Sequence, residues 1–262
     1  IAIHNALLYR DLGESYANLE RAQEELLRQE RLAALGQIGA VMAHELRNPL
    51  AVIFNSLGPL RQLLRPEGDV AMLLTIIEEE SDRLNRIVGS LLDYARPTTL
   101  QLSEGNLTSL LHEVLRDAST DPAYHAGIEV ETAYEHEEGP FVFDEHLLRQ
   151  ALINLLQNAF QSIKQQGSVR ITTCDLVVDG RPCVRIAISD SGAGIRPEIR
   201  ERIFEPFFTT RVTGTGLGLP IVKRVIEDHR GRLELESTVG EGTTFTVTVP
   251  RGGVSTTRSP SA

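Results

Sequence analysis

Residues 44–49 read His-Glu-Leu-Arg-Asn-Pro and stand within an apolar repeat that predicts a long helix. From Leu46 onward the apolar residues follow at alternating intervals of four and three, which places them on one side of a helix. This apolar seam predicts that the helix packs against another helix. The seam comprises Leu46, Leu50, Ile53, Leu57, Leu60 and Leu64.

The polar residues of the same stretch face away from the seam. At about 100° per residue, His44 lies roughly 200° from Leu46. Asn48 lies one turn beyond His44 on the same face, and Glu45 lies beside both. Pro49 cannot donate a hydrogen bond to the carbonyl of Glu45, so we expect the helix to be loosened or kinked there. Taken alone, the stretch is either an exposed reactive imidazole with polar neighbours or an ordinary solvated face with a proline.

Length and composition narrow the class of protein. A chain of 262 residues predicts one or two domains, and 41% hydrophobic with 24% charged residues is typical of a soluble protein. The net charge of −10 argues against a general affinity for nucleic acid or anionic membranes, although it does not exclude a local phosphate site.

The cysteines and the start of the chain suggest a cellular setting. Cys174 and Cys183 have no partners at metal-ligand spacing, so we expect reduced thiols and a cytoplasmic location. No apolar run approaches the roughly 20 residues that span a bilayer. The chain starts at Ile1 without a signal peptide, so we expect it to be part of a longer protein.

The first third of the sequence predicts a helical hairpin. Residues 4–64 contain few helix breakers, and Leu12, Leu19, Leu26 and Ala33 recur every seven residues, which indicates a weak two-stranded coiled coil. A turn at 65–69 and a second helix to about residue 95 follow. Because each helix has an unpaired apolar stripe, two hairpins are expected to form a four-helix bundle. The inner face of the second helix is expected to carry Val70, Leu73, Ile77, Leu84, Ile87, Val88, Leu91 and Leu92.

Beyond Pro97 the pattern changes to mixed strands and helices. Asp179-Gly180 predicts a hairpin turn between strands at 169–173 and 184–189, and a second strand pair is expected at 233–235 and 244–249. Helices are expected at about 106–118, 145–165 and 217–229. The acidic stretch from Glu129 to Glu138 is interpreted as a solvated edge and loop without chemistry, and residues 252–262 as a disordered tail.

One predicted helix carries a line of amides. Gln150, Asn154 and Asn158 recur every four residues on an otherwise apolar helix. Buried amides need partners, and their oxygens suit Mg²⁺, which keeps several waters and binds substrate phosphates. The alternative is that backbone groups satisfy these amides and the line is structural.

Three loops follow that could bind a nucleotide. Asp190, directly after a strand, can accept a hydrogen bond from an exocyclic amine, and the glycines that follow allow close approach of a flat ring, although such turns are also common structural features. The Phe-rich segment 204–208 resembles an apolar anchor for a mobile loop. Residues 214–220, Gly-Thr-Gly-Leu-Gly-Leu-Pro, offer unpaired N–H groups to phosphates at a helix start. Their glycine spacing does not fit a dinucleotide-binding loop.

Together these motifs resemble, in order, the H, N, G1, F and G2 boxes of bacterial sensor histidine kinases, over roughly residues 31–250. The resemblance implies an α+β multidomain fold, in which a long helical hairpin forms a dimeric four-helix bundle. An α/β sandwich of the GHKL (Bergerat) ATP-binding type, shared with gyrase, Hsp90 and MutL-type ATPases, follows it. The implied domains are a signalling coiled coil at 1–30, the hairpin at 31–97, the catalytic domain at 98–251 and a tail at 252–262. Residues 1–15 resemble the last helix of a GAF sensor domain.

The resemblance also implies roles for particular residues. His44 would be the phosphoacceptor and Glu45 its general base, while Asn48 would position the water that dephosphorylates a response-regulator aspartate. Asn158 would hold Mg²⁺ and Asp190 would bind the adenine amine of ATP. The implied partners are a second copy of the chain and a receiver domain. The nucleotide-binding set is Asn154, Asn158, Asp190, Gly192, Gly194, Arg211, Gly214, Gly216, Gly218 and Leu219.

One position departs from the family pattern. Many relatives carry a basic residue three positions after the Mg²⁺-binding Asn, where this chain has Gln161, so Arg211 in the lid is expected to meet the phosphate charge instead. The short lid and the pair Gln161-Ser162 resemble the nitrogen-regulation branch. Six other histidines lack the context of His44 and are expected at the surface: His4, His112, His125, His136, His146 and His229.

Two alternative functions remain open from the sequence. A dimeric scaffold could bind nucleotide without phosphorylating, but the intact residues His44, Glu45, Asn158 and Asp190 argue against it. A conformational ATPase of the gyrase or Hsp90 type would need a base inside the nucleotide domain and no upstream phosphoacceptor helix.

Overall fold

The computed structural model describes residues 49–53, 55–64, 67–95, 99–139, 141–211 and 214–252. The chain divides into two compact units, Ile1–Pro97 and Thr98–Ala262. The predicted coiled coil at 1–30, the residues His44, Glu45 and Asn48, and positions 253–262 of the predicted tail lie outside the described residues.

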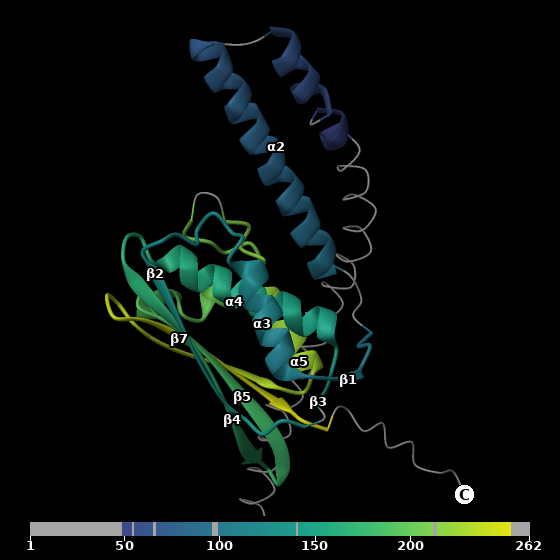
Figure 1. Ribbon diagram of the computed structural model, residues 1–262, viewed down its shortest axis with the longest axis vertical. Coiled ribbons are helices and arrows are strands. Elements are labelled where there is room, and N and C mark those ends of the chain that lie inside the picture. Colours follow the sequence, from purple (N-terminus) through teal and green to yellow (C-terminus); the bar gives the residue numbers. More distant parts are fainter. Residues whose placement is uncertain are drawn as a thin grey trace, which may run out of the picture. The chain divides into compact units, whose positions relative to one another are not determined.

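The first unit contains a helical hairpin. Residues 49–53 and 55–64 are helical, and α2 (Gly68–Ala95) follows them. Leu50 and Val88 form a buried cluster, and Arg61 Nη1 lies 2.6 Å from Glu78 Oε2. These pairs show that the two helices run antiparallel, as Figure 1 also shows.

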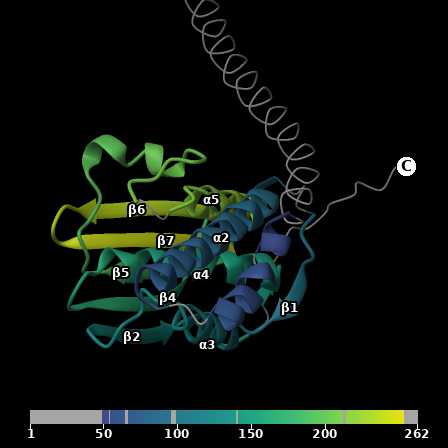
Figure 2. The ribbon, with the colours of Figure 1, turned by 90° about the horizontal axis from the view of Figure 1, so that it is seen from above.

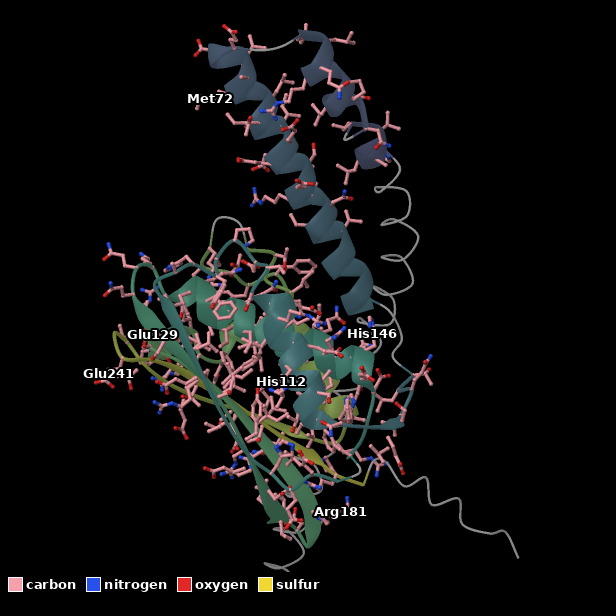
Figure 3. All side chains as sticks on the ribbon, viewed as in Figure 1. Met72, His112, Glu129, His146, Arg181 and Glu241 are labelled. Atoms are coloured by element: carbon pink, nitrogen blue, oxygen red, sulfur yellow. The ribbon has the colours of Figure 1, made fainter. Side chains whose placement is uncertain are left out.

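Among the described side chains of this hairpin, the buried ones form a narrow stripe along each helix. Leu50 and Leu57 are buried on the first helix, and Leu74, Ser81 and Val88 are buried on α2, each seven residues from the next. Val88 of the predicted inner face of α2 is buried in the single hairpin, and the exposed members of that face are those that the second hairpin of the predicted bundle would cover, so this part stays a prediction. Figure 3 shows Met72 on the outer side of α2. Within the described part of this unit, the exposed large apolar residues are Val52, Ile53, Leu60, Leu63, Leu64, Val70, Met72, Leu73, Ile76, Ile77 and Leu84.

The second unit is built on a five-stranded sheet. Its strand order is β2-β4-β5-β7-β6, with β2 and β4 parallel and the other pairs antiparallel, as Figure 2 shows. At the predicted turn, Asp179 and Gly180 both have positive φ, the requirement of a tight hairpin turn. The strands are β2 (Ile128–Glu135), β4 (Gly167–Val178), β5 (Arg181–Asp190), β6 (Arg232–Thr238) and β7 (Gly242–Pro250).

Three helices cover one face of this sheet (Figure 1). Helix α4 (Glu145–Ser162) lies between α3 (Leu107–Ala118) and α5 (Gly218–Asp228). Helices α3 and α4 start where short polar side chains cap them: Asn106 accepts from the Ser109 N–H, and Asp144 accepts from the Leu147 N–H. A two-stranded sheet of β1 (Ser103–Gly105) and β3 (Phe141–Phe143) and two 3-10 turns, η1 (Pro197–Ile199) and η2 (Arg202–Phe204), complete the unit.

The core lies between the helices and the sheet. Alternate residues of the central strands point to the helices, since each β-strand presents every second side chain to the same face. Ile186 of β5 and Leu152, Leu155 and Phe160 of α4 are fully buried there. This rigid contact fixes the ends of β5 and α4, where the predicted site residues lie.

The structure confirms one prediction about the second unit and corrects two. The acidic stretch is an edge and a loop, as expected, because Ile128–Glu135 forms the edge strand β2 and residues 136–139 follow it without regular structure. Gly252, the first residue of the predicted tail, forms a bridge with Val142. His229 is buried because its ring makes two hydrogen bonds: Nδ1 lies 2.7 Å from the Val225 carbonyl, and Nε2 accepts the Asp144 N–H at 3.0 Å.

Among the described helices, none combines the length and the apolar character that crossing a lipid bilayer requires.

Candidate functional site

The site lies at the end of the sheet where β5 finishes. Asp190, the last residue of β5, pairs with Val169 of β4 and Thr243 of β7. Figure 3 labels Glu129 and Glu241 near this end and Arg181 at the opposite end of the sheet. The antiparallel register therefore brings the start of β7 beside the end of β5.

Two donors hold the Asp190 carboxylate. Its Oδ1 accepts a hydrogen bond of 2.7 Å from the Ser162 hydroxyl and one of 2.8 Å from the Gly192 N–H. Burial raises the pKa of the Asp190 carboxyl, while these hydrogen bonds, the Thr243 backbone and the charge of Arg211 act in the opposite direction. A carboxylate can accept about four hydrogen bonds, so capacity remains for a further donor.

Glycines surround this carboxylate because side chains would not fit. A Cβ at Gly192 would lie 2.0 Å from Ser162 Oγ, and one at Gly194, where φ is +68°, would lie 2.1 Å from the Thr238 carbonyl oxygen. Gly242 has φ +126°, and a Cβ there would lie 1.8 Å from the Asp190 carbonyl oxygen. The glycines therefore allow backbone to approach the half-buried Asp190 closely, which suits recognition of a flat ring.

The amide line of α4 meets the lid at Asn158. Asn154 and Asn158 are half-buried, as is Gln150. Arg211 Nη1 donates to Asn158 Oδ1 at 3.1 Å and also to Gln161 Oε1, while Nη2 donates to the Asn158 carbonyl at 3.3 Å. Burial lowers the pKa of the Arg211 guanidinium, and the nearby Asp190 raises it. Arg211 thus contacts Gln161 directly, while its expected role toward phosphate stays a prediction.

The glycine-rich segment leads into α5. Helix α5 starts at Gly218, and its N-cap residue Leu217 makes no side-chain capping hydrogen bond within the described part of the chain. A Cβ at Gly218 would lie 3.3 Å from Asn154 Oδ1, which brings this helix start beside the amide line. Leu219 is half-buried in the first turn. N–H groups without a cap, at the positive end of a helix dipole, can bind phosphate.

The remaining glycines pack against the Phe-rich segment. Gly216 has φ +69°, and a Cβ there would lie 2.5 Å from the Phe207 carbonyl carbon. The Phe207 N–H donates to the Gly216 carbonyl at 3.0 Å, and Phe207 itself has φ +66° with an exposed ring. Gly214 packs against Thr209, since a Cβ there would lie 2.4 Å from its hydroxyl. The lid is therefore tied at its base by backbone contacts, while the Phe208 ring lies under Arg202.

The site contains residues that the sequence analysis did not assign. The sequence analysis gave Ser162 only as part of a branch pattern, and it assigned no role to Gly242 or Thr243. Their role depends on β7 lying beside β5, which local sequence does not show. The signal that could have found Ser162 is its place at the end of the amide helix, four residues after Asn158.

Two family models match the chain. The model described as "His Kinase A (phospho-acceptor) domain" matches residues 34–100, and the one described as "Histidine kinase-, DNA gyrase B-, and HSP90-like ATPase" matches residues 143–253. Sensor histidine kinase ZraS of Escherichia coli (strain K12) is 36% identical over 228 residues, covering 87% of this chain and 48% of ZraS. The chain thus spans about half the length of this relative.

Solved structures show the same fold. The full-length ShkA structure in complex with AMPPNP matches with a TM-score of 0.67 and 30% identity, over 83% of this chain and 46% of ShkA. Histidine kinase ThkA in complex with the response regulator protein TrrA matches with a TM-score of 0.61 and 32% identity, over 88% of this chain and 66% of ThkA. The separate catalytic domain of ThkA is 34% identical, with a TM-score of 0.50, over 58% of this chain and 96% of that domain.

The matches define a class of protein in which a phosphoacceptor helical hairpin precedes a GHKL-type ATPase domain. The chain belongs to the two-component sensor histidine kinases.

Proposed function

We propose that this chain phosphorylates His44 with ATP and passes the phosphoryl group to an aspartate of a response-regulator receiver domain. The observation that carries the proposal is the meeting of Asn158, Asp190 and Arg211 in one site. Support comes from ShkA, solved with AMPPNP, and from ThkA, solved with a response regulator. The proposed domains are those of the sequence analysis: 1–30, 31–97, 98–251 and 252–262.

The nucleotide-binding roles follow from the geometry around β5 and α5. Asp190 accepts a hydrogen bond from the adenine amine, and Gly192 and Gly194 line the base pocket. The phosphates lie against the N–H groups that begin α5, where Gly218 is close to Asn154 and no side chain caps the helix in the described residues. Arg211 supplies the positive charge that Gln161 cannot. Gly214, Gly216 and Leu219 complete the phosphate side of the site.

The residues present suit a Mg²⁺ ion that takes most of its ligands from substrate phosphates and water. No group of three or more His, Cys, Asp or Glu residues is arranged to hold a metal within the described residues. Asn158 offers one amide oxygen at the site, and Mg²⁺ commonly uses one or two protein ligands besides phosphates and water. When bound, the ion would neutralise phosphate charge during transfer.

His44, Glu45 and Asn48 of the hairpin carry out the phosphoryl transfer and the hydrolysis in this proposal. One imidazole nitrogen of His44 forms a bond to the γ-phosphorus while the bond to the β,γ-bridging oxygen breaks and ADP leaves. Glu45 takes the proton of the other ring nitrogen as the phosphorylated imidazole forms. Asn48 orients the water that hydrolyses the regulator's aspartyl phosphate. Phosphatase activity is thus part of the proposal.

We also propose that the chain is a homodimer joined through the hairpin. The exposed apolar residues of α2 and the preceding helix form the surface that a second hairpin would cover. The free thiols Cys174 and Cys183 and the use of ATP favour a cytoplasmic location.

Incubation with γ-labelled ATP tests the proposed reaction. We expect acid-labile label on the protein, no label on the His44→Ala variant, and transfer of the label to a receiver domain. His44→Ala should bind ATP with nearly unchanged affinity, because the acceptor lies outside the nucleotide unit. Released phosphate without labelled protein would instead show a conformational ATPase, and binding with neither product would show a scaffold.

A further inference from the structure

Ser162 lies at a point where its hydroxyl has two acceptors. It is the last residue of α4, and its Oγ is 2.7 Å from both the Ala159 carbonyl oxygen and Asp190 Oδ1. A hydroxyl has one proton, and a hydrogen bond to an ionised carboxylate is about twice as strong as one to a neutral carbonyl. The proton therefore goes to Asp190 when that carboxyl is ionised.

The backbone of Ser162 supports the same arrangement. Its carbonyl accepts the Ala193 N–H at 3.3 Å, so α4 is tied to the turn that follows Asp190. The missing side chain of Gly192 provides the space that the Ser162 hydroxyl occupies. Side chain and backbone together hold the end of α4 against residues 190–193, and the carboxylate cannot rotate without losing a hydrogen bond.

We propose that Ser162 is a positioning residue that orients the Asp190 carboxylate for the 6-amino group of a purine, and thereby sets the preference for adenine over a 6-oxo purine. This inference rests on the proposed function of Asp190 in nucleotide binding. An ionised, oriented carboxylate accepts from an amine and repels a carbonyl oxygen. A protonated carboxyl group can instead donate to a carbonyl oxygen, which removes the basis for discrimination.

The effect of Ser162 on the Asp190 carboxylate can be tested separately from that of the other groups around it. Ser162 faces the carboxylate from α4, Thr243 from β7, the Gly192 N–H from the following turn and the Arg211 charge from the lid. Of these, Arg211 is the one charged side chain within the described residues that acts on the group. Removing the Ser162 hydroxyl leaves Arg211 and Gly192 in place, so the carboxylate loses one donor and protonates at a higher pH.

Binding of ATP and inosine triphosphate to the full chain, measured from pH 5.5 to 8, tests the inference. Ser162→Ala removes a single oxygen atom. We expect it to weaken ATP binding roughly tenfold, as loss of a hydrogen bond to a charged group does. It should weaken inosine triphosphate binding less, and move the acid-side loss of ATP affinity to higher pH. Ser119→Ala is the matched control, because Ser119 also ends a helix and donates to a backbone carbonyl, that of Leu115, at 2.7 Å.

A second variant separates this inference from the proposed function. Asp190→Asn should weaken ATP binding whatever Ser162 does. If it weakens binding while Ser162→Ala keeps the parent's affinity, pH profile and nucleotide preference, the role of Ser162 is wrong and the site stands. If Asp190→Asn binds ATP as the parent does, the proposed adenine site itself is wrong.

Discussion

Arg211 of the lid donates a hydrogen bond of 3.1 Å to the amide oxygen of Asn158, the atom proposed to bind Mg²⁺. A cation and a guanidinium cannot both use this oxygen fully, so we expect nucleotide binding to move Arg211 away from Asn158. The phosphates would provide its new partner, since a guanidinium binds phosphate through two parallel hydrogen bonds.

Arg211→Ala should therefore weaken binding of ATP much more than binding of adenosine. Loss of a charged hydrogen bond to phosphate predicts about a tenfold or larger decrease in ATP affinity. Adenosine has no phosphates, and its affinity should change less than about twofold. Isothermal titration of both ligands makes the comparison, with Arg185→Ala, an exposed arginine of β5, as the control. An equal loss for both ligands would mean that Arg211 shapes the pocket and does not contact phosphate.

Asp190→Asn should separate stability from nucleotide binding. Burial raises the pKa of Asp190, so the ionised carboxyl is less favourable in the folded protein than in the unfolded chain. The resulting loss in the free energy of unfolding is fully present above the raised pKa. The amide removes the cost, and its oxygen can still accept from Ser162 and Gly192. We expect the unliganded variant to melt about 1–2 °C higher at pH 7.

The difference in melting temperature between the parent and Asp190→Asn should shrink as the pH falls. As pH falls through the raised pKa, the parent takes up a proton and its cost disappears, so the two melting temperatures should converge. ATP should stabilise the parent and have little effect on the variant, because the amide NH₂ cannot accept a hydrogen bond from the adenine amine. A variant that melts lower than the parent at pH 7 would contradict the direction of the burial effect.

Most elements of the second unit could be predicted because their signals are local. The caps Asn106 and Asp144, the Asp179-Gly180 turn and the apolar stripes set α3, α4 and the β4–β5 hairpin within a few residues of the expected bounds. Strand β2 was predicted only as a solvated edge, without strand bounds, because Glu129 and Glu131 alternate along it as on a solvated surface. Only its parallel pairing with β4, a long-range contact, makes it a strand.

In the site, too, the residues of local motifs could be predicted, whereas contacts between distant segments could not. Motifs placed Asp190, Asn158 and the glycines in one predicted site, and the structure brings Asp190, Asn158 and Arg211 together. The contact of Ser162 with Asp190 could not be predicted, because it joins residues 28 apart through the packing of α4 on the sheet. The residues of the hairpin proposed to act with this site lie outside the described chain and stay predictions.

His229 was predicted at the surface, but its burial could have been predicted from local sequence. It lies three and four residues after Ile226 and Val225 of α5, on the face that packs against the sheet. His229→Ala removes the acceptor for the buried Asp144 N–H and the ring contact of the Val225 carbonyl, which keeps the N–H of residue 229 as donor. We expect a loss of about 2–3 kcal/mol in the free energy of unfolding. Urea unfolding followed by circular dichroism measures it, with the exposed His146→Ala, expected to change less than about 0.5 kcal/mol, as control.

The last prediction concerns the reverse reaction on the regulator. The sequence predicts that Asn48 follows His44 by one helical turn on the face opposite the apolar seam, where we expect its amide to orient water and not to pack. Asn48→Ala should leave autophosphorylation within about tenfold of the parent, roughly 1.4 kcal/mol in barrier, because attack on ATP needs only the imidazole and Glu45. Dephosphorylation of the regulator should slow far more, since its water must be held in line with the aspartyl phosphate. Both rates are measured on the purified variant with a phosphorylated receiver domain. Equal losses would show that Asn48 supports His44 or the helix, and the phosphatase role would then be withdrawn.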